Sequence, residues 1–322
     1  MAAEKDGIVY TITGGGMTAY DDETRETRTF STIEGLSGIT PTTIYHEKST
    51  GLIFIGYPDG MINYFSDPKN IRFLSDIQRN AFYTQKQIYR FVSQGNRLFV
   101  ATDFGMVIYN LNNLLPELTV TQISNNPSRQ KVASLGIYDG RIWALVEGRG
   151  LYSAPYDFPT LADPSVWKRE DGIEGLPPGQ EVKEVGANSE AAYARTDTAV
   201  FIRQNGQWTA DPRFRGFFGK LDVQEEGVSA SFATRSVVYI KNGPSYTIFI
   251  DGAVSHTLIV GQVIYLSDVF LGFKRFENFE LEVIAPEGPS NNNCIRVAAN
   301  NGELYVAPGG YNDGFGPNFN AS

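Results

Sequence analysis

An aromatic-centred apolar strand recurs eight times along this 322-residue chain, each time followed by a turn and a second apolar run. Consecutive aromatic positions are 33 to 50 residues apart. The eight positions are Tyr10, Phe54, Phe99, Trp143, Tyr193, Phe232, Tyr265 and Tyr305. A repeat of about 40–50 residues built from short strands is typical of a β-propeller, in which each repeat forms one blade. The repeat predicts an architecture but not a function, because propellers host enzymes, receptors and scaffolds alike.

Within the first three repeats an apolar residue follows the aromatic by seven positions, at Met17, Met61 and Met106. A glycine precedes each of these methionines, which suits a tight hairpin. Another strand and turn lie upstream of each aromatic, and the last strand of each repeat is more polar, as expected where a blade meets solvent. Each repeat therefore predicts a four-stranded antiparallel sheet, with the methionines and aromatics packed between blades.

The repeat count predicts an all-β, seven-bladed propeller over residues 1–298. Residues 299–322, which contain Tyr305, either supply the last strand of the ring or begin a second propeller or linker. Residues 1–7 lead directly into the first repeat strand, so we expect the first blade to be truncated at its start. Both ends look cut, which indicates a segment of a longer, exported protein whose signal peptide lies outside this sequence.

The composition argues against several classes of function. The net charge is −9 and the pI is about 4.9, which does not suit a nucleic-acid partner. No apolar run approaches the roughly 18 residues that a membrane span needs. The single cysteine, Cys294, excludes a disulfide within the chain, and only His46 and His256 could supply imidazole ligands. We therefore expect no metal site and no cofactor.

No catalytic motif stands out. The chain lacks the Ser-x-Asp-x-Gly-x-Thr-Trp boxes of sialidase-type rings and the Gly-x-Ser-x-Gly elbow of hydrolases. Acidic pairs could in principle serve glycoside chemistry, but they fall in predicted turns or outer strands, where solvated charge is expected. These pairs are Asp21–Asp22, Glu170–Asp171 and Glu225–Glu226. The sequence thus favours a binding protein over an enzyme, and a propeller hydrolase or lyase is the weakest alternative.

Thr198 is a candidate modification site. It lies in the tripeptide Asp197-Thr198-Ala199, which resembles an O-glycosylation signal of exported proteins in some gut and oral bacteria. The tripeptide falls where the other repeats place their hairpin turn, so the Thr198 hydroxyl should be accessible.

Two segments between blades, Ile33–Gly38 and Ile173–Pro178, share the pattern Ile-Glu-Gly-Leu-Ser/Pro and resemble the two-component regulator propeller repeat. The finer pattern of residues 29–63, 97–111 and 301–310 is similar to the first propeller of PorZ-type proteins. This resemblance implies an exported, surface-associated component of the bacterial type IX secretion machinery, with two seven-bladed propellers and a carboxy-terminal sandwich domain.

The PorZ resemblance also implies a non-enzymatic scaffold in the periplasm or at the outer cell surface, with an envelope protein or glycan (lipopolysaccharide) as partner. The alternative is the ligand-sensing propeller of a hybrid two-component histidine kinase. The sequence does not indicate which loops bind the ligand.

Overall fold

A computed structural model describes residues 1–126, 128–171, 176, 181–216, 218–269, 272–285, 294–300, 303–308, 310–311 and 317–318. The chain divides into two compact units, Met1–Ile284 and Ala285–Ser322. The boundary between them lies earlier than the predicted limit of the propeller at residue 298.

The first unit contains seven four-stranded antiparallel sheets, each built from four consecutive strands. The first three sheets are β1 (Ala2–Lys5), β2 (Ile8–Thr13), β3 (Gly16–Asp21) and β4 (Thr27–Phe30); β5 (Thr43–Glu47), β6 (Leu52–Gly56), β7 (Ile62–Phe65) and β8 (Arg72–Leu74); and β9 (Ile88–Gln94), β10 (Arg97–Thr102), β11 (Gly105–Asn110) and β12 (Pro116–Val120). The fourth and fifth are β13 (Val132–Tyr138), β14 (Arg141–Val146), β15 (Gly150–Pro155) and β16 (Lys168–Arg169); and β17 (Glu184–Ala187), β18 (Ala192–Arg195), β19 (Ala199–Gln204) and β20 (Gln207–Arg215). The last two are β21 (Lys220–Gln224), β22 (Gly227–Phe232), β23 (Arg235–Ile240) and β24 (Ser245–Phe249); and β25 (Val254–Val260), β26 (Val263–Asp268), β27 (Gly272–Glu277) and β28 (Glu280–Ile284).

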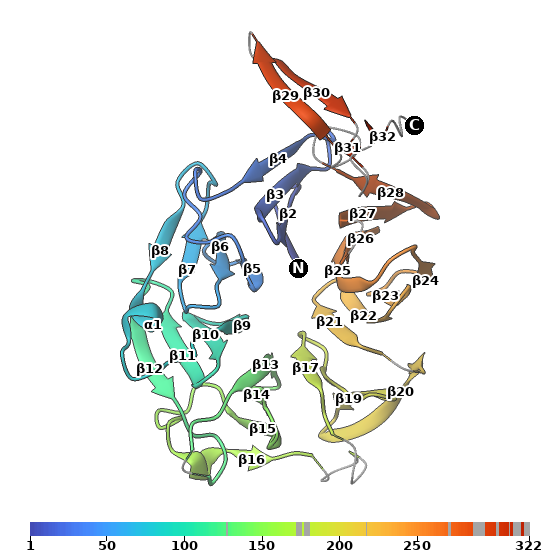
Figure 1. Ribbon diagram of the computed structural model, residues 1–322. Coiled ribbons are helices and arrows are strands. Elements are labelled where there is room, and N and C mark those ends of the chain that lie inside the picture. The colour runs from blue at the N-terminus through green and yellow to red at the C-terminus, as the bar shows by residue number, and fades with distance from the viewer. Residues whose placement is uncertain are drawn as a thin grey trace. The chain divides into compact units, whose positions relative to one another are not determined.

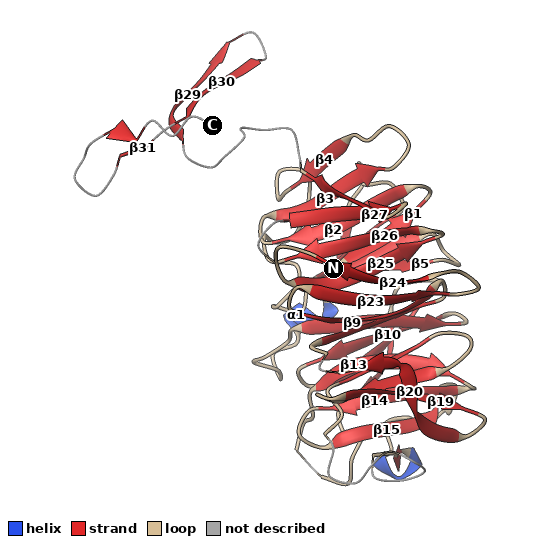
Figure 2. Cartoon of the chain, turned by 90° about the vertical axis from the view of Figure 1, so that its right-hand side faces the viewer, coloured by secondary structure: helices blue, strands red, loops and turns tan. Residues whose placement is uncertain are grey.

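These sheets are the blades of a ring, with the first strand of each towards the centre and the fourth at the rim (Figure 1). The only helices within the described part of the chain are short, namely α1 (Asp76–Arg79) and the 3-10 turn η1 (Pro164–Val166), and strands dominate the side view (Figure 2). The predicted seven-bladed propeller of four-stranded antiparallel sheets is therefore confirmed. No helix in the described ranges is both long enough and apolar enough to span a membrane.

The first blade is complete, contrary to the prediction that it is truncated at its start. β1 pairs with β2 in antiparallel register, with Ala2 opposite Thr11 and Lys5 opposite Ile8. The prediction failed because Ala2–Lys5 is too short and too polar to be identified as a strand from its pattern alone. Pairing with β2 holds residues Ala2–Lys5 in an extended strand, although their own sequence does not predict one.

The predicted aromatic positions of the ring all fall in the second strand of a blade. Six of the seven are buried, and Phe232 is the exception at 51% exposure. Phe232 lies opposite Arg235 at the hairpin end of β22, where the strand leaves the sheet interior, while Val228 of the same strand is buried. The buried apolar residue of the second strand in the sixth blade is thus the aliphatic Val228. The prediction that Phe232 takes this place was wrong by a few positions.

The glycine that opens the third strand of a blade permits a close approach between strands. Gly105 has a φ of +135°, and a Cβ on it would lie 2.0 Å from the carbonyl oxygen of Val120 at the end of β12. Only glycine can occupy such a position without displacing the neighbouring strand. The positive φ agrees with the prediction for the glycine before Met106, whereas the close approach to β12 is a second reason for glycine that was not predicted.

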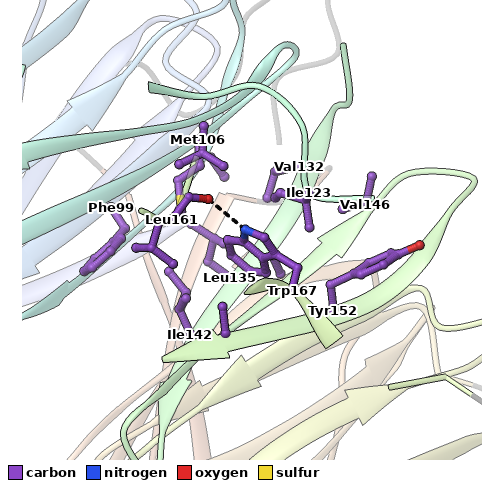
Figure 3. Packing of buried hydrophobic residues seen from close by; sticks show 14 of the residues in the cluster. Phe99, Met106, Ile123, Val132, Leu135, Ile142, Val146, Tyr152, Leu161 and Trp167 are labelled. Carbon is purple, nitrogen blue, oxygen red and sulfur yellow. Dashed lines mark hydrogen bonds between the residues drawn. The ribbon is translucent and has the colours of Figure 1, made fainter. Parts of the chain in front are cut away.

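Seven clusters of buried hydrophobic side chains lie between successive blades, one at each junction of the described ring. The cluster between the third and fourth blades contains Phe99 and Met106 on one side and Ile142 and Trp167 on the other (Figure 3). Trp167 Nε1 donates a hydrogen bond to the carbonyl oxygen of Leu161 at 2.9 Å, so the indole is buried with its polar atom paired. The apolar faces of the blades therefore hold the ring together.

The two motifs Ile33–Gly38 and Ile173–Pro178 occupy equivalent junctions. Leu36 is 4% exposed and packs between the first and second blades. Leu176 is also 4% exposed and packs between the fourth and fifth. The other residues of the second motif lie outside the described residues.

The second unit contains β29 (Cys294–Asn300) paired with β30 (Glu303–Pro308), and β31 (Gly310–Tyr311) paired with β32 (Pro317–Asn318). Tyr305 lies in β30, which pairs with β29 in a sheet of their own. The strand that contains Tyr305 therefore does not complete any of the seven sheets of the ring.

Candidate functional site

The innermost strands of all seven blades line one cavity at the centre of the ring, with a volume of about 430 Å³. The strands are β1, β5, β9, β13, β17, β21 and β25, and each contacts the next around the ring, including β25 with β1. Concave, largely apolar cavities of this size, with a few polar groups, are the usual form of a ligand site. The cavity is therefore the candidate binding site of the propeller.

Polar groups gather where β5 ends beside β9. The Glu47 carboxylate accepts hydrogen bonds from the backbone and hydroxyl groups of Ser49 and Thr50, at 2.6 to 3.1 Å. Ser93 bonds to both Glu47 and the hydroxyl of Tyr45, at 3.2 and 2.8 Å. Burial alone would raise the pKa of Glu47, but the hydrogen bonds from Thr50 and Ser49 outweigh it and lower that pKa. Glu47 is thus held as a carboxylate.

An ion pair joins the second and sixth blades. Lys48 Nζ lies 2.9 Å from Glu226 Oε1, although 178 residues separate them. The two side chains are 64% and 38% exposed, so the pair contributes little to stability. Lys48 and Glu226 both line the cavity, so this ion pair lies at the cavity wall.

A buried polar contact links the sixth, seventh and first blades. His256 Nδ1 lies 2.6 Å from Asp222 Oδ1, and His256 Nε2 lies 3.2 Å from the carbonyl oxygen of Ala2. The backbone N–H of Thr257 donates to the other Asp222 oxygen at 2.8 Å. Because a carboxylate only accepts, Nδ1 carries the proton in this contact. Burial alone would raise the pKa of Asp222, but His256, Lys220 and the Thr257 N–H hold that pKa below its ordinary value.

This contact predicts a loss of stability in acid. The folded-state pKa of Asp222 is lowered, so its contribution is present above about pH 4 and is lost as the pH falls through the folded-state pKa. We expect Asp222→Asn to lower the free energy of unfolding by about 2–3 kcal/mol at pH 7, and by much less at pH 3. Urea unfolding at both pH values measures this difference. Asp157→Asn, at an exposed position, is the control and should change neither value appreciably. If Asp222→Asn lowered the free energy of unfolding by the same amount at both pH values, the ionised form of Asp222 would not be what stabilises the fold.

The two histidines have different surroundings. His46 lies in β5 and lines the cavity, and its buried Nδ1 has no hydrogen-bond partner among the described residues. His256 forms the contact with Asp222, which the sequence analysis missed. The separation of 34 residues between Asp222 and His256 is close to one repeat. A search for polar residues that lie one repeat apart, on the innermost strands of adjacent blades, could therefore have predicted the contact between Asp222 and His256.

The acidic pairs are not all solvated. Glu170 is 1% exposed and accepts a hydrogen bond from the Ser153 hydroxyl at 2.6 Å. Its expected position at the surface was wrong, because Glu170 directly follows the short outer strand β16 and stays paired with β15, where its backbone N–H donates to the carbonyl oxygen of Leu151 at 2.8 Å. Asp22 forms an ion pair with Arg275 at 2.6 Å, and Glu226 forms the pair with Lys48.

Thr198 lies at the tip of the hairpin between β18 and β19 and is exposed, as the repeat predicted. Its glycosylation stays a prediction.

Cys294 lies in β29 of the second unit. Within the described residues no group of three or more His, Cys, Asp or Glu side chains could hold a metal ion.

Residues 9–168 match the family described as TSS9, PorZ, N-terminal beta-propeller domain. No curated protein sequence matches the chain significantly.

Several solved structures share the fold. PorZ, a bacterial surface component of the type-IX secretion system of Porphyromonas gingivalis, is 21% identical with a TM-score of 0.75, over 97% of this chain and 41% of PorZ. An extracellular domain assigned to a hybrid two component system of B. thetaiotaomicron is 15% identical with a TM-score of 0.55, over 86% of this chain and 37% of that one. Raptor of Chaetomium thermophilum is 11% identical with a TM-score of 0.63, over 88% of this chain and 27% of Raptor. This chain thus spans less than half the length of each of these proteins.

Proposed function

We propose that this chain, whose residues 9–168 match the PorZ N-terminal beta-propeller family, acts as a non-enzymatic binding scaffold in an exported component of a type IX secretion system. The observation that carries the proposal is the family match over residues 9–168, on a ring whose fold agrees with PorZ over 97% of this chain. The partner would be a protein or a glycan of the envelope, such as lipopolysaccharide. Loops on a rigid ring suit such a role because the scaffold holds them in place.

The electrostatics of the cavity support binding over catalysis. A general acid at neutral pH needs a carboxyl group whose pKa is raised. Glu47 and Asp222, which lie in or beside the cavity, have lowered pKa values and are engaged by hydrogen bonds. Both are thus held in the charged form by the fold.

A sensor ring is the second candidate, because the fold is also similar to an extracellular domain of a hybrid two component system. In that case the propeller would bind a signal molecule, with saccharides as the first class to screen. A membrane span and a kinase domain elsewhere in the full gene would favour the sensor, whereas a sandwich-like tail would favour the scaffold.

Deletion of the gene in the bacterium that encodes it tests the proposed function. We expect fewer type IX cargo proteins anchored at the cell surface, counted by proteomics of the surface and the medium. Restoring the whole gene should recover them, which is the control for effects on neighbouring genes. An unchanged set of anchored cargo would rule out the scaffold and leave the sensor, to be tested by screening saccharides against the purified ring.

A further inference from the structure

We infer that the central cavity binds a carboxylate carried on an apolar group, and that Arg90 of β9 holds the carboxylate. The ligand class is thus an apolar stem with one oxyanion, as in the carboxy terminus of an apolar peptide or a fatty acid. The inference concerns the ring itself and does not depend on the function proposed above.

The first argument is that Arg90 has no partner in the wall of the cavity. Every other charged side chain that lines it has a hydrogen-bond or ion-pair partner within the protein. These side chains are Glu4, Glu47, Lys48, Glu225 and Glu226. Arg90 has neither a hydrogen bond nor an ion pair among the described residues, although it is half-buried. A half-buried guanidinium without a counter-charge favours the binding of an anion.

The second argument is the direction of the Arg90 side chain. Arg90 belongs to the third blade, yet its Nη2 lies 3.6 Å from the position that a Cβ would take on Gly186 in the fifth blade. It also lies near Tyr45 of the second blade: burial raises the pKa of Tyr45, and the charge of Arg90 acts against that rise. The guanidinium therefore reaches along the cavity wall past the fourth blade, where it is accessible to a ligand from inside.

The third argument is the chemistry of the walls. Val92, Ile137, Ala187 and Val260 are half-buried and line the same cavity. A planar guanidinium matches a carboxylate with two parallel hydrogen bonds, and the apolar walls suit the stem that carries it. A volume of about 430 Å³ accommodates a small ligand of this kind.

Calorimetric titration of the full chain with two probes tests the inference. The probes are octanoate and the dipeptide acetyl-Leu-Val with a free carboxyl terminus. We expect at least one of them to bind, and its neutral counterpart, octanol or acetyl-Leu-Val amide, to bind at least about tenfold more weakly. The probe that binds more tightly tells whether the natural ligand is a fatty acid or a peptide end.

Variants of Arg90 locate the site. Arg90→Gln should weaken the bound acid by at least about tenfold, and Arg90→Lys by less, because lysine keeps the charge and loses the paired geometry. Arg79→Gln, at an exposed position in α1, is the matched control and should bind as the wild type does. If Arg90→Gln does not fold, the comparison of acid with neutral probe on the wild-type chain still decides. Failure of both acids to bind, equal binding of acid and neutral probe, or unchanged affinity in a folded Arg90→Gln would each overturn the inference.

Discussion

Tyr20→Ala is expected to lower the free energy of unfolding by about 3–4 kcal/mol, because Tyr20 closes the ring. Each blade consists of consecutive strands, so no strand is shared between the first and seventh blades. Side chains must therefore hold that junction. Tyr20 is 2% exposed and packs edge-on against Tyr265, which is 1% exposed, with ring centroids 6.3 Å apart. The shift of the urea midpoint measures the loss.

The ion pair across the same junction acts with this aromatic contact. Arg275 donates to both oxygens of Asp22, at 2.6 and 3.3 Å. Burial alone would raise the pKa of Asp22, but the hydrogen bonds from Arg275 and Tyr265 lower it. Arg275 also pairs with Glu277 of its own blade at 2.9 Å, so the apolar centre of the junction is flanked by a charged cluster.

Phe249→Ala is the control for Tyr20→Ala. Phe249 is 69% exposed on β24, so its truncation should cost less than about 0.5 kcal/mol. If Tyr20→Ala were no more destabilising than Phe249→Ala, the contact between Tyr20 and Tyr265 would not be what closes the ring.

The repeat made the blades predictable from the sequence, because each blade repeats a local pattern of apolar and turn residues. Tyr10, Phe54 and Phe99 could be placed in second strands, since the same neighbours recur around each of them. The closure of the ring was not predictable in this way. Tyr20 and Tyr265 meet only because seven blades complete a circle, and no local pattern contains that information.

The cavity was predictable only as a general feature of propellers. Arg90 lies in β9, where only Ile88 and Phe91 are fully buried, and nothing in its neighbouring residues distinguishes it from a surface arginine. Its position at the centre depends on which edge of the blade faces the axis. The contact between His256 and Asp222 was closer to prediction, because the two lie about one repeat apart on adjacent inner strands.

Gly136→Ala is expected to lower the free energy of unfolding by about 2–3 kcal/mol, because the inner strands of the fourth and fifth blades meet at Gly136 without a side chain between them. A Cβ on Gly136 would lie 2.8 Å from the backbone nitrogen of Ala187 and 2.9 Å from the carbonyl carbon of Gly186. These are backbone atoms of β17, so they cannot rotate away as a side chain could. The added methyl group must push the two blades apart, and chemical unfolding measures the cost.

Gly15→Ala is the matched control, because a Cβ on Gly15 would have no atom within 4 Å. The same substitution there should change the free energy of unfolding by less than about 0.5 kcal/mol, since an alanine in open space only restricts the unfolded chain. Because Gly136 follows Leu135, which lines the cavity, separation of the fourth and fifth blades should also alter the wall that faces the ligand. Equal stability of the two variants would show that the inner strands can move apart without cost, and the ring would then be a compliant support and not the rigid one that a binding scaffold requires.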